Sequence, residues 1–491
     1  MIQLQICQEG LEHNIKRARE HGVILPTIAQ MQHPETIPEK IRDRLRDVGL
    51  WEVNPLNLFR ITWKNEAREK GGLFQPVPNY VELPPALTGV PCRIVAMAGK
   101  WFPTGCHKVG ASFGCLAPKL VTGQFDVERQ KAVWPSTGNY CRGGVFNSAL
   151  LGTQGVAILP GDMSRERFQW LREMGAEIIA TPGGESDVRE IFDKTDELGR
   201  DPRYMVFNQF AEMGNPLWHY NVTGNALADV FEAVRRPGDR FAGACFSSGS
   251  SGTLSAGDRL KERYPRLKLA VGEPAQCPII LEGGFGSHRI EGIGDKFIPW
   301  VHNVRNTDLV IDIDDEDSQR LLRLFNTPEG QTYLREELGL EDDLLEQLTW
   351  MGISGIANVL CCIKMAKYFE LTERDVVATV LTDSAVLYGS RIEELNERHG
   401  PYTVREAAMD HALHMLGMRT DRMRELTYPD RKRVHNLKYF TWVEQEGKTA
   451  AELDALWYDP EGTWDAVHAQ AGELDALIDA FNDATGLLKN L

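Results

Sequence analysis

Short apolar runs rich in β-branched residues alternate with longer stretches of helical character between about residues 80 and 390. The clearest runs lie at 93–97, 156–159, 177–180, 267–271 and 376–381. The runs are predominantly apolar instead of alternating strictly with polar residues, which is typical of parallel strands buried on both faces. The pattern therefore predicts an α/β protein whose parallel sheets are covered by helices.

The two ends of the chain follow a different pattern. Residues 1–60 combine helical charge patterning at 11–19 with a proline-containing linker at 34–38. Beyond Arg391 the alternation stops, and helices are predicted at 406–418, closed by Gly417, and at 473–488. In the second of these helices the apolar residues recur at the amphipathic spacing i, i+3, i+4 and i+7: Leu474, Leu477, Ile478 and Phe481. We therefore expect a helical extension at each end.

Length, charge and cysteine usage limit the classes to which the chain can belong. With 491 residues it is too long for one ordinary core, so two or three domains are expected. A net charge of −16 argues against binding to nucleic acid or to an anionic membrane. The nine cysteines form no CxxC pair, and residues 1–19 have no signal-peptide core. We expect a cytoplasmic protein with reduced thiols, no transmembrane segment and no metal site.

Four short segments carry residues suited to chemistry. The first, at 103–110, places Lys108 just after a Pro-Thr-Gly turn and before small residues. The second, at 136–139, reads Ser-Thr-Gly-Asn and follows an apolar run. The third, at 248–253, reads Ser-Gly-Ser-Ser-Gly-Thr and lies between an apolar run and a helical stretch. The fourth is Thr-Asp-Ser at 382–384, at the end of a predicted strand, with Tyr388 beyond it.

Each segment has a chemical interpretation and a plainer alternative. A lysine amine forms a Schiff base when burial or positive neighbours lower its pKa, although most lysines are surface residues. A glycine- and serine-rich loop between a strand and a helix can hold a phosphate, although such a loop can also be only a turn. The Ser-Thr-Gly-Asn segment can bind a carboxylate or cap a helix. Together, a lysine, a phosphate cradle, an asparagine facing a ring and a hydroxyl for a ring nitrogen are what pyridoxal 5′-phosphate requires.

These segments resemble those of the fold-type II (β-family) pyridoxal-phosphate-dependent enzymes, in particular the cysteine synthase and cystathionine β-synthase group. Residues 136–139 are similar to the Thr-Ser-Gly-Asn loop of that group, and 249–253 to its Gly-Thr-Gly-Gly-Thr phosphate loop. The stretch at 271–299 resembles a long segment of cysteine synthases, and 352–358 resembles their Gly-Ile-Ser-Ser-Gly-Ala-Asn helix start. Residues 382–388 match the Pro-Asp-Ser-x-x-x-Tyr ending of cystathionine β-synthases, so the likeness spans roughly residues 80–390.

The resemblance implies a role for each candidate residue. Lys108 would bind the cofactor as a Schiff base and later move the α-proton of the substrate, and Asn139 would bond the 3′-oxygen of the cofactor. The phosphate would be held by the third segment: Gly249, Ser250, Ser251, Gly252 and Thr253. The substrate would be bound around the second segment: Ser136, Thr137, Gly138 and Tyr140. Ser384 would bond the pyridine nitrogen, with Asp383 as the alternative; a hydroxyl there leaves that nitrogen unprotonated and favours chemistry at the β-carbon.

The resemblance also implies a domain organisation. The expected order is an N-terminal extension (1–60), a smaller domain with the lysine and asparagine loops (61–220), a larger domain with the phosphate loop (221–392) and a helical C-terminal appendage (393–491). Members of this fold type usually assemble as homodimers. The chain departs from cysteine synthases at 104–107, which look more like the tryptophan synthase β subunit, and at Tyr140, where sulfhydrylases have a small threonine. The identity of the substrate therefore stays open.

The implied function is that of a pyridoxal-phosphate-dependent lyase or transferase. It would replace the β-substituent of an L-alanine derivative, such as O-acetylserine or serine, through an aminoacrylate. β-Elimination, as in an amino-acid deaminase or ammonia-lyase, is the alternative within the same chemistry. In another class, a non-catalytic cofactor-binding or partner-binding protein on the same fold would keep its function without Lys108. A nucleotide-dependent oxidoreductase would need GxGxxG followed by an acidic residue, an arrangement that the sequence does not contain.

Overall fold

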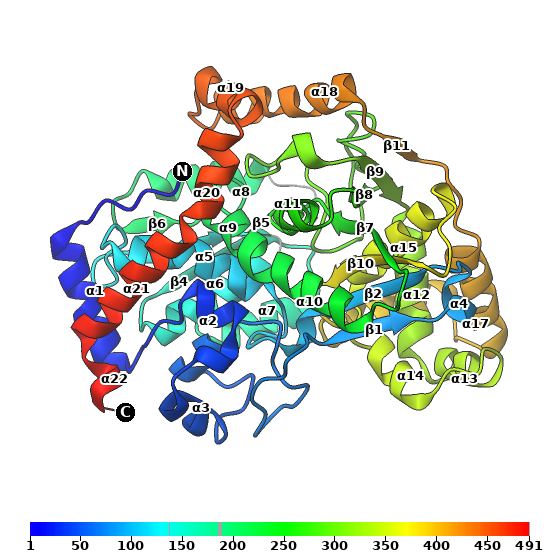
Figure 1. Ribbon diagram of the computed structural model, residues 1–491, viewed down its shortest axis with the longest axis horizontal. Helices are drawn as coiled ribbons and strands as arrows, with labels where there is room; N and C mark the ends of the chain where they lie inside the picture. The colour runs from blue at the N-terminus through cyan, green and yellow to red at the C-terminus, as the bar shows by residue number, and fades with distance from the viewer. Residues whose placement is uncertain (137, 185–188, 491) are drawn as a thin grey trace.

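Two β-sheets organise the computed structural model, which describes residues 1–136, 138–184 and 189–490 (Figure 1). The larger sheet has seven strands in the order β1-β2-β10-β7-β8-β9-β11, and the smaller has four in the order β5-β4-β3-β6. The larger sheet consists of β1 (Tyr80–Leu83), β2 (Arg93–Ala98), β10 (Asp375–Leu381), β7 (Arg240–Ser247), β8 (Lys268–Pro274), β9 (Leu309–Ile313) and β11 (Met423–Glu425). The smaller sheet consists of β5 (Glu177–Thr181), β4 (Gly155–Pro160), β3 (Lys131–Pro135) and β6 (Tyr204–Val206).

The apolar runs of the sequence form parallel strands; most of these are inner strands, whereas β5 lies at the edge of the smaller sheet. β2, β4 and β10 are buried at every position, as expected for strands covered by helices on both faces. The smaller sheet is parallel throughout, whereas β1 and β11 pair antiparallel at the two edges of the larger sheet. The predicted α/β class with helix-covered parallel sheets is confirmed.

The two sheets are not formed by two consecutive parts of the chain, as the expected domains at 61–220 and 221–392 would require. β1 and β2 precede the smaller sheet in sequence but belong to the larger one, where β2 pairs with β10 in parallel. The three-residue strand β11, from the C-terminal appendage, extends the same sheet beside β9. The chain therefore enters the larger sheet, crosses to the smaller one and returns, and residues 393–491 are not purely helical.

Helices surround both sheets. The longer ones before β7 are α1 (Gln8–His21), α5 (Lys108–Val121), α6 (Asn139–Leu150), α7 (Arg165–Glu173), α8 (Arg189–Gly199) and α10 (Gly224–Val234). After β7 come α11 (Leu254–Arg263), α12 (Asp315–Asn326), α13 (Pro328–Glu336), α15 (Ile353–Tyr368), α16 (Gly389–His399), α17 (Val404–His411), α18 (Tyr428–Lys438), α19 (Ala450–Tyr458) and α21 (Ala471–Thr485). Shorter helices include α2 (Ile28–Gln32), α3 (Glu39–Leu45), α4 (Pro85–Thr88), α9 (Gly214–Trp218), α14 (Asp342–Leu348), α20 (Ala466–Ala469) and α22 (Leu487–Asn490).

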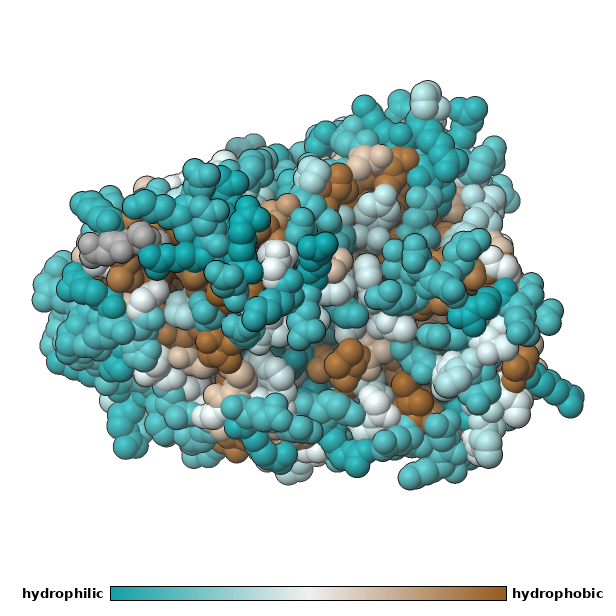
Figure 2. Space-filling model, turned by 90° about the horizontal axis from the view of Figure 1, so that it is seen from below, coloured by the Kyte–Doolittle hydropathy of each residue, from teal (hydrophilic) through white to brown (hydrophobic). Residues whose placement is uncertain are grey.

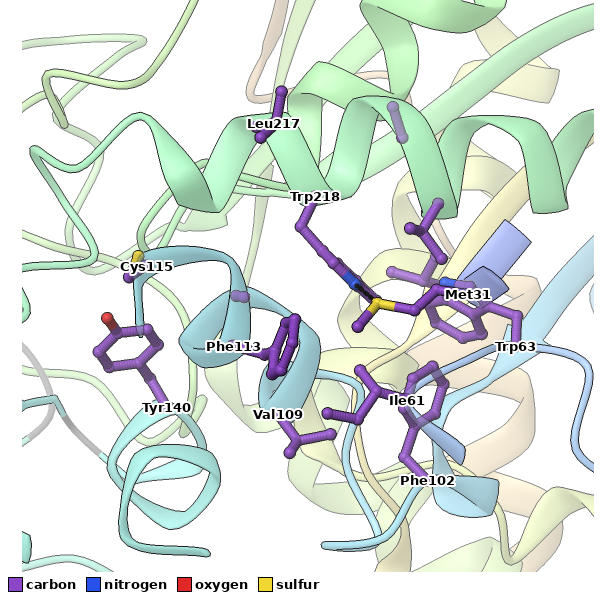
Figure 3. Packing of buried hydrophobic residues seen from close by; sticks show 14 of the residues in the cluster. Met31, Ile61, Trp63, Phe102, Val109, Phe113, Cys115, Tyr140, Leu217 and Trp218 are labelled. Atoms are coloured by element: carbon purple, nitrogen blue, oxygen red, sulfur yellow. Dashed lines mark hydrogen bonds between the residues drawn. The ribbon is translucent and has the colours of Figure 1, made fainter. Parts of the chain in front are cut away.

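Helix α5 lies at the centre of the main hydrophobic core. Val109 and Phe113 project from it toward Ile61 and Phe102, and Trp218 of α9 reaches across to Met31 (Figure 3). The indole nitrogen of Trp218 lies 3.2 Å from the Met31 sulfur. A side chain at Gly110 would place its Cβ 2.1 Å from the Trp218 ring, so this glycine allows α5 and α9 to pack closely. The packing fixes the start of α5, where Lys108 lies.

The two terminal extensions pack against each other. α1 and α21 lie side by side at one edge of the molecule (Figure 1). The Asn482 side chain accepts a hydrogen bond from the Leu25 amide at 2.9 Å and donates one to its carbonyl at 2.8 Å. The predicted C-terminal helix is confirmed as α21, with its apolar residues buried. The predicted helix closed by Gly417 is confirmed as α17, continued by a wider turn over Ala412–Leu416.

The surface is predominantly hydrophilic on the face shown in Figure 2, where apolar side chains appear in scattered groups. Within the residues that the structure describes, no single helix is long and apolar enough to cross a membrane. One pair, α14 and α15, has the required length and composition only when its members are taken together, and they meet at an angle of 111°.

Candidate active site

Lys108 is the first residue of α5, and its side chain reaches from this helix to the loop after β7. The amine donates hydrogen bonds to the Ser250 hydroxyl at 2.7 Å and to the side-chain oxygen of Gln209 at 3.3 Å. Burial lowers the pKa of Lys108 to about 8, because the charged form loses its hydration. A substantial fraction of the amine is therefore neutral, and nucleophilic, near pH 8.

Asn139 is likewise the first residue of its helix, α6. Gly138 before it has a φ of 151°, and a Cβ there would lie 1.9 Å from a guanidinium nitrogen of Arg167. Glycine is thus required both by the backbone conformation and by the close approach of Arg167. The Gly138 amide donates to the Ser136 hydroxyl at 3.0 Å, which closes the turn, and Thr137 lies outside the described residues.

Tyr140 follows Asn139 and points into the protein interior. Its ring packs against Trp134, with centroids 5.6 Å apart, and its hydroxyl donates to the Phe207 carbonyl at 3.2 Å. Figure 3 shows the ring beside Cys115 of α5. Burial raises the pKa of the Tyr140 phenol well above its usual range. The hydroxyl is therefore engaged with the backbone, although the residue still lines the cavity at Lys108 described below.

The serine-rich loop after β7 forms a tight turn at the carboxyl end of the larger sheet and leads into α11. Ser251 has a positive φ of 61°, and its hydroxyl lies 2.9 Å from that of Ser248. The Ser250 hydroxyl accepts a hydrogen bond from Asn215 at 3.1 Å in addition to that from Lys108. Among the described residues, no carbonyl accepts a hydrogen bond from the backbone N–H groups of residues 249–253. These amides are available to an anion at the start of α11.

A buried polar cluster, here called the Arg167 cluster, links Asn139 at the start of α6 to the segment that follows β10. It consists of Asn139, Arg167, Glu291, Asp383 and Tyr388. Asp383 accepts hydrogen bonds from the Asn139 amide at 2.6 Å and the Tyr388 hydroxyl at 2.7 Å. Arg167 lies 3.6 Å from Asp383 and 3.0 Å from Glu291. The cluster thereby fixes the orientation of the Asn139 side chain.

The same cluster affects the choice between Ser384 and Asp383. Asp383 is fully buried; one of its carboxylate oxygens is shared by Asn139 and Tyr388, and the other has no hydrogen-bond partner among the described residues. Burial raises the pKa of Asp383, and the nearby Arg167 opposes this shift. Ser384 is 4% exposed and begins the turn after β10, whereas Thr382, the first residue of the same segment, to which the sequence assigned no role, lines the cavity at Lys108.

The candidate segments meet at one narrow cavity, here called the Lys108 cavity. It is lined by Lys108, Ser136, Asn139, Tyr140, Gln209, Phe210, Gly249, Ser250, Gly292, Ile293, Asp295 and Thr382. Three further candidates belong to the loop that borders it: Ser251, Gly252 and Thr253. Sequence reasoning missed Gln209 and Asp295. The acidic residue directly after Gly-Ile-Gly was the only signal for Asp295, whereas Gln209 stands in no motif.

Comparison with known proteins places this site in a family. The model of the pyridoxal-phosphate dependent enzymes matches residues 81–332, just over half of the chain. The chain belongs to this family, whose cofactor is pyridoxal phosphate. The match includes the lysine, asparagine and serine-rich segments, and the resemblance on which the predicted cofactor rested is confirmed.

The curated relatives that match include cysteine synthases. A probable cysteine synthase of Bacillus subtilis is 33% identical over 198 residues, which are 40% of this chain and 62% of the relative. The chain thus spans less than two thirds of that relative's length. A cysteine synthase of Staphylococcus aureus is 31% identical over 257 residues, which are 52% of this chain and 74% of the relative.

Solved structures share the fold at lower sequence identity. An O-acetylserine-dependent cystathionine β-synthase from Helicobacter pylori is 24% identical, with a TM-score of 0.53 over 64% of this chain and 95% of that one. A hydrogen sulfide-producing enzyme from Fusobacterium nucleatum is 23% identical, with a TM-score of 0.53 over 63% of this chain and 95% of that one.

The residues around the Lys108 cavity fit pyridoxal phosphate. The Lys108 amine has the lowered pKa that Schiff-base chemistry needs. The side-chain oxygen of Asn139 is buried without a hydrogen-bond partner among the described residues, so the amide has bonding capacity left for a ligand. The amides of residues 249–253 and the dipole of α11 suit a phosphate. An amine, an amide and an anion cradle converge on one cavity.

Reconstitution of the cofactor-free protein with pyridoxal phosphate is expected to accelerate with rising pH and to level off above about pH 8. The neutral form of the Lys108 amine attacks the aldehyde, and burial lowers the pKa of this amine to about 8. An ordinary lysine, with a pKa of about 10.4, would give a rate that keeps rising to about pH 10. Stopped-flow absorbance measures the rate, and an unbroken rise past about pH 9 would contradict burial of the amine.

Proposed function

We propose that the protein catalyses β-replacement on a β-substituted L-alanine, such as O-acetyl-L-serine or L-serine. The observation that carries this proposal is the convergence of Lys108, Asn139 and the loop at 249–253 on one cavity. Support also comes from relatives named cysteine synthase and from the O-acetylserine-dependent cystathionine β-synthase that shares the fold. β-Elimination is the second candidate, favoured by the fold shared with a hydrogen sulfide-producing enzyme.

The side chains have separate tasks in this proposal. Pyridoxal phosphate, when bound, supplies a ring that withdraws electrons from the α-carbon of an amino acid. Lys108 holds the cofactor and takes the α-proton of the substrate at its Nζ, within reach of Ser250. Asn139 bonds the 3′-oxygen, residues 249–253 hold the phosphate, and Ser384 bonds the ring nitrogen because Asp383 is engaged in the Arg167 cluster. Residues 136–138, with Tyr140 after them, bind the substrate carboxylate; of these, Thr137 lies outside the described residues.

The serine and the aspartate at the ring nitrogen can be told apart by substitution. Ser384→Ala is expected to shift the visible absorption of the bound cofactor and to lower kcat by about tenfold, since it removes a hydrogen bond to the ring. Asp383→Asn is expected to leave the absorption maximum in place and to weaken cofactor binding, since it disturbs Asn139. A spectral shift in Asp383→Asn, with none in Ser384→Ala, would reverse the assignment.

The function is tested with purified protein loaded with pyridoxal phosphate. Addition of O-acetyl-L-serine or L-serine is expected to change the visible spectrum, and addition of a thiol to restore it with formation of a thioether amino acid. Pyruvate and ammonia released without a thiol would favour β-elimination. A protein that binds the cofactor but shows no spectral change with any β-substituted alanine would contradict both reactions and favour a non-catalytic binding protein. Size-exclusion chromatography of the same sample tests the proposed homodimer.

A further inference from the structure

Asp295 is a buried acid at the Lys108 cavity, and none of the roles proposed above involves it. It directly follows Gly294, whose amide donates to the Ser248 carbonyl at 2.7 Å and so attaches this loop to the serine-rich loop. The Asp295 carbonyl accepts a weak hydrogen bond from the Cys277 thiol, with sulfur and oxygen 3.6 Å apart. Asp295 is 5% exposed and lines the cavity together with Lys108. The acid is therefore held in place by the same loops that form the cavity.

The Asp295 carboxyl group is not satisfied by the protein. One of its oxygens is buried and has no hydrogen-bond partner among the described residues. Buried carboxyl oxygens in folded proteins are almost always bonded to a donor, so this oxygen has bonding capacity left for a ligand or a water molecule in the cavity. Burial raises the pKa of Asp295 to about 7, and the positive charge of Lys108 opposes this rise. At neutral pH the group is thus divided between acid and carboxylate.

Four titratable groups lie near Asp295 in space or in sequence. Lys108, on α5, is the cation whose charge acts on it. Burial raises the pKa of the Cys277 thiol to about 11, so this thiol stays protonated. His288 lies 3.2 Å from the Gly294 carbonyl, and the neighbouring Lys296 is exposed at the surface. Asp295 is therefore positioned to exchange a proton with a molecule in the cavity.

We propose that Asp295 determines the leaving group: its carboxylic acid donates a proton to the β-oxygen of the substrate and so admits L-serine. This proposal rests on the β-replacement function proposed above. Hydroxide is a poor leaving group and needs a proton as it departs, whereas the acetate of O-acetylserine departs without one. Asp295 is a buried acid beside the amine that takes the α-proton. It can therefore give the departing hydroxide the proton that acetate does not need.

The proton transfers balance over one turnover. Lys108 Nζ takes the α-proton, the bond between Cβ and oxygen breaks with its electron pair on the oxygen, and Asp295 protonates that oxygen to give water. The incoming thiol then forms the bond from sulfur to Cβ and gives its S–H proton to the Asp295 carboxylate. Lys108 returns its proton to the α-carbon. Serine and a thiol thus give a thioether amino acid and water, with no further reactant.

The test compares two substrates in wild-type protein and in Asp295→Asn. For L-serine, kcat/KM is expected to fall by about 10²-fold or more, whereas for O-acetyl-L-serine it should fall less than about fivefold. In wild-type protein the ratio of L-serine to O-acetyl-L-serine activity is expected to fall above about pH 7, because the acid loses its proton, and Asp295→Asn should remove this dependence. Asp295→Ala serves as a second variant with the same expected loss.

Binding of an unreactive amino acid separates chemistry from misfolding. L-Alanine has no β-substituent to lose, so its dissociation constant, followed by visible absorbance, should change less than about threefold in both Asp295 variants. Lys296→Gln, which alters the adjacent exposed residue, should leave both substrate activities near wild type. Equal losses for the two substrates, or a wild-type protein that uses O-acetyl-L-serine but never L-serine, would overturn the role of Asp295. A wild-type protein inactive on both would refute the proposed function itself.

Discussion

Lys108→Ala is expected to abolish the visible absorption band of the bound cofactor and to lower kcat/KM by roughly 10⁴-fold. Both the covalent attachment and the transfer of the α-proton depend on this amine, and loss of a positioned base alone costs about 10²–10⁴-fold. Among the described residues that line the cavity, Lys108 is the only lysine, and Ser250 lies 2.7 Å from its amine. Absorbance and steady-state kinetics of the loaded protein measure the two effects.

A lysine on the same helix provides the matched control. Lys119 pairs with Glu212 at 2.7 Å and lies outside the Lys108 cavity. Lys119→Ala should therefore keep the absorption band and most of the activity. In Lys108→Ala, added methylamine should restore part of the rate, because a free amine can occupy the space of the missing side chain. Full activity in Lys108→Ala would show that the chemistry takes place elsewhere.

Arg167→Met is expected to lower the free energy of unfolding by roughly 3–5 kcal/mol. Arg167 is fully buried between Asp383 and Glu291, which are 0% and 2% exposed. Methionine has similar length but no charge, so Asp383 would remain buried without its cation. Breaking one side of a buried ion pair is costly because the remaining charge has lost its water and its partner. Denaturant unfolding of the loaded protein, followed by tryptophan fluorescence, measures the loss.

The preceding arginine on α7 provides the comparison for Arg167. Arg165 pairs with Glu393, and their side chains are 75% and 67% exposed. Exposed ion pairs contribute about 0–1 kcal/mol, so Arg165→Ala should have little effect on stability. Equal destabilisation by the two substitutions would mean that α7 contributes through its packing and that the Arg167 cluster does not depend on charge.

The sequence predicted the main inner strands and the edge strand β5, and it missed the short edge strands β1, β6 and β11 as well as the buried strand β9. β2 and β10 were evident because most of their residues are apolar, and the structure buries every one of them. β1 and β6 escaped because they are short and partly exposed, so their hydrophobic signal is weak. The assignment of β1 and β2 to the larger sheet also lay beyond local patterns, since it depends on which strands pair over long distances.

In the candidate site, too, residues in local motifs were predicted, and residues that depend on the tertiary fold were missed. Lys108, Asn139 and the loop at 249–253 stand in local motifs whose residue types carry the chemistry, and the fold brings them to one cavity. Arg167 was not singled out, because an arginine on an amphipathic helix is usually exposed, and only the tertiary fold places it against Asp383. Asp295 gains its significance in the same way, from burial beside Lys108.

The long-range pairing of β2 bears on the order in which the protein can fold during synthesis. The smaller sheet comes entirely from residues 131–206, so it can form as soon as that segment has left the ribosome. β2, at 93–98, must wait for β10, at 375–381, to receive its parallel neighbour. Throughout that interval β2 has only β1 as a neighbour and its other edge is unpaired, which makes the nascent chain prone to aggregation and a client of chaperones. Expression at low temperature or with added chaperones should therefore raise the yield of folded protein.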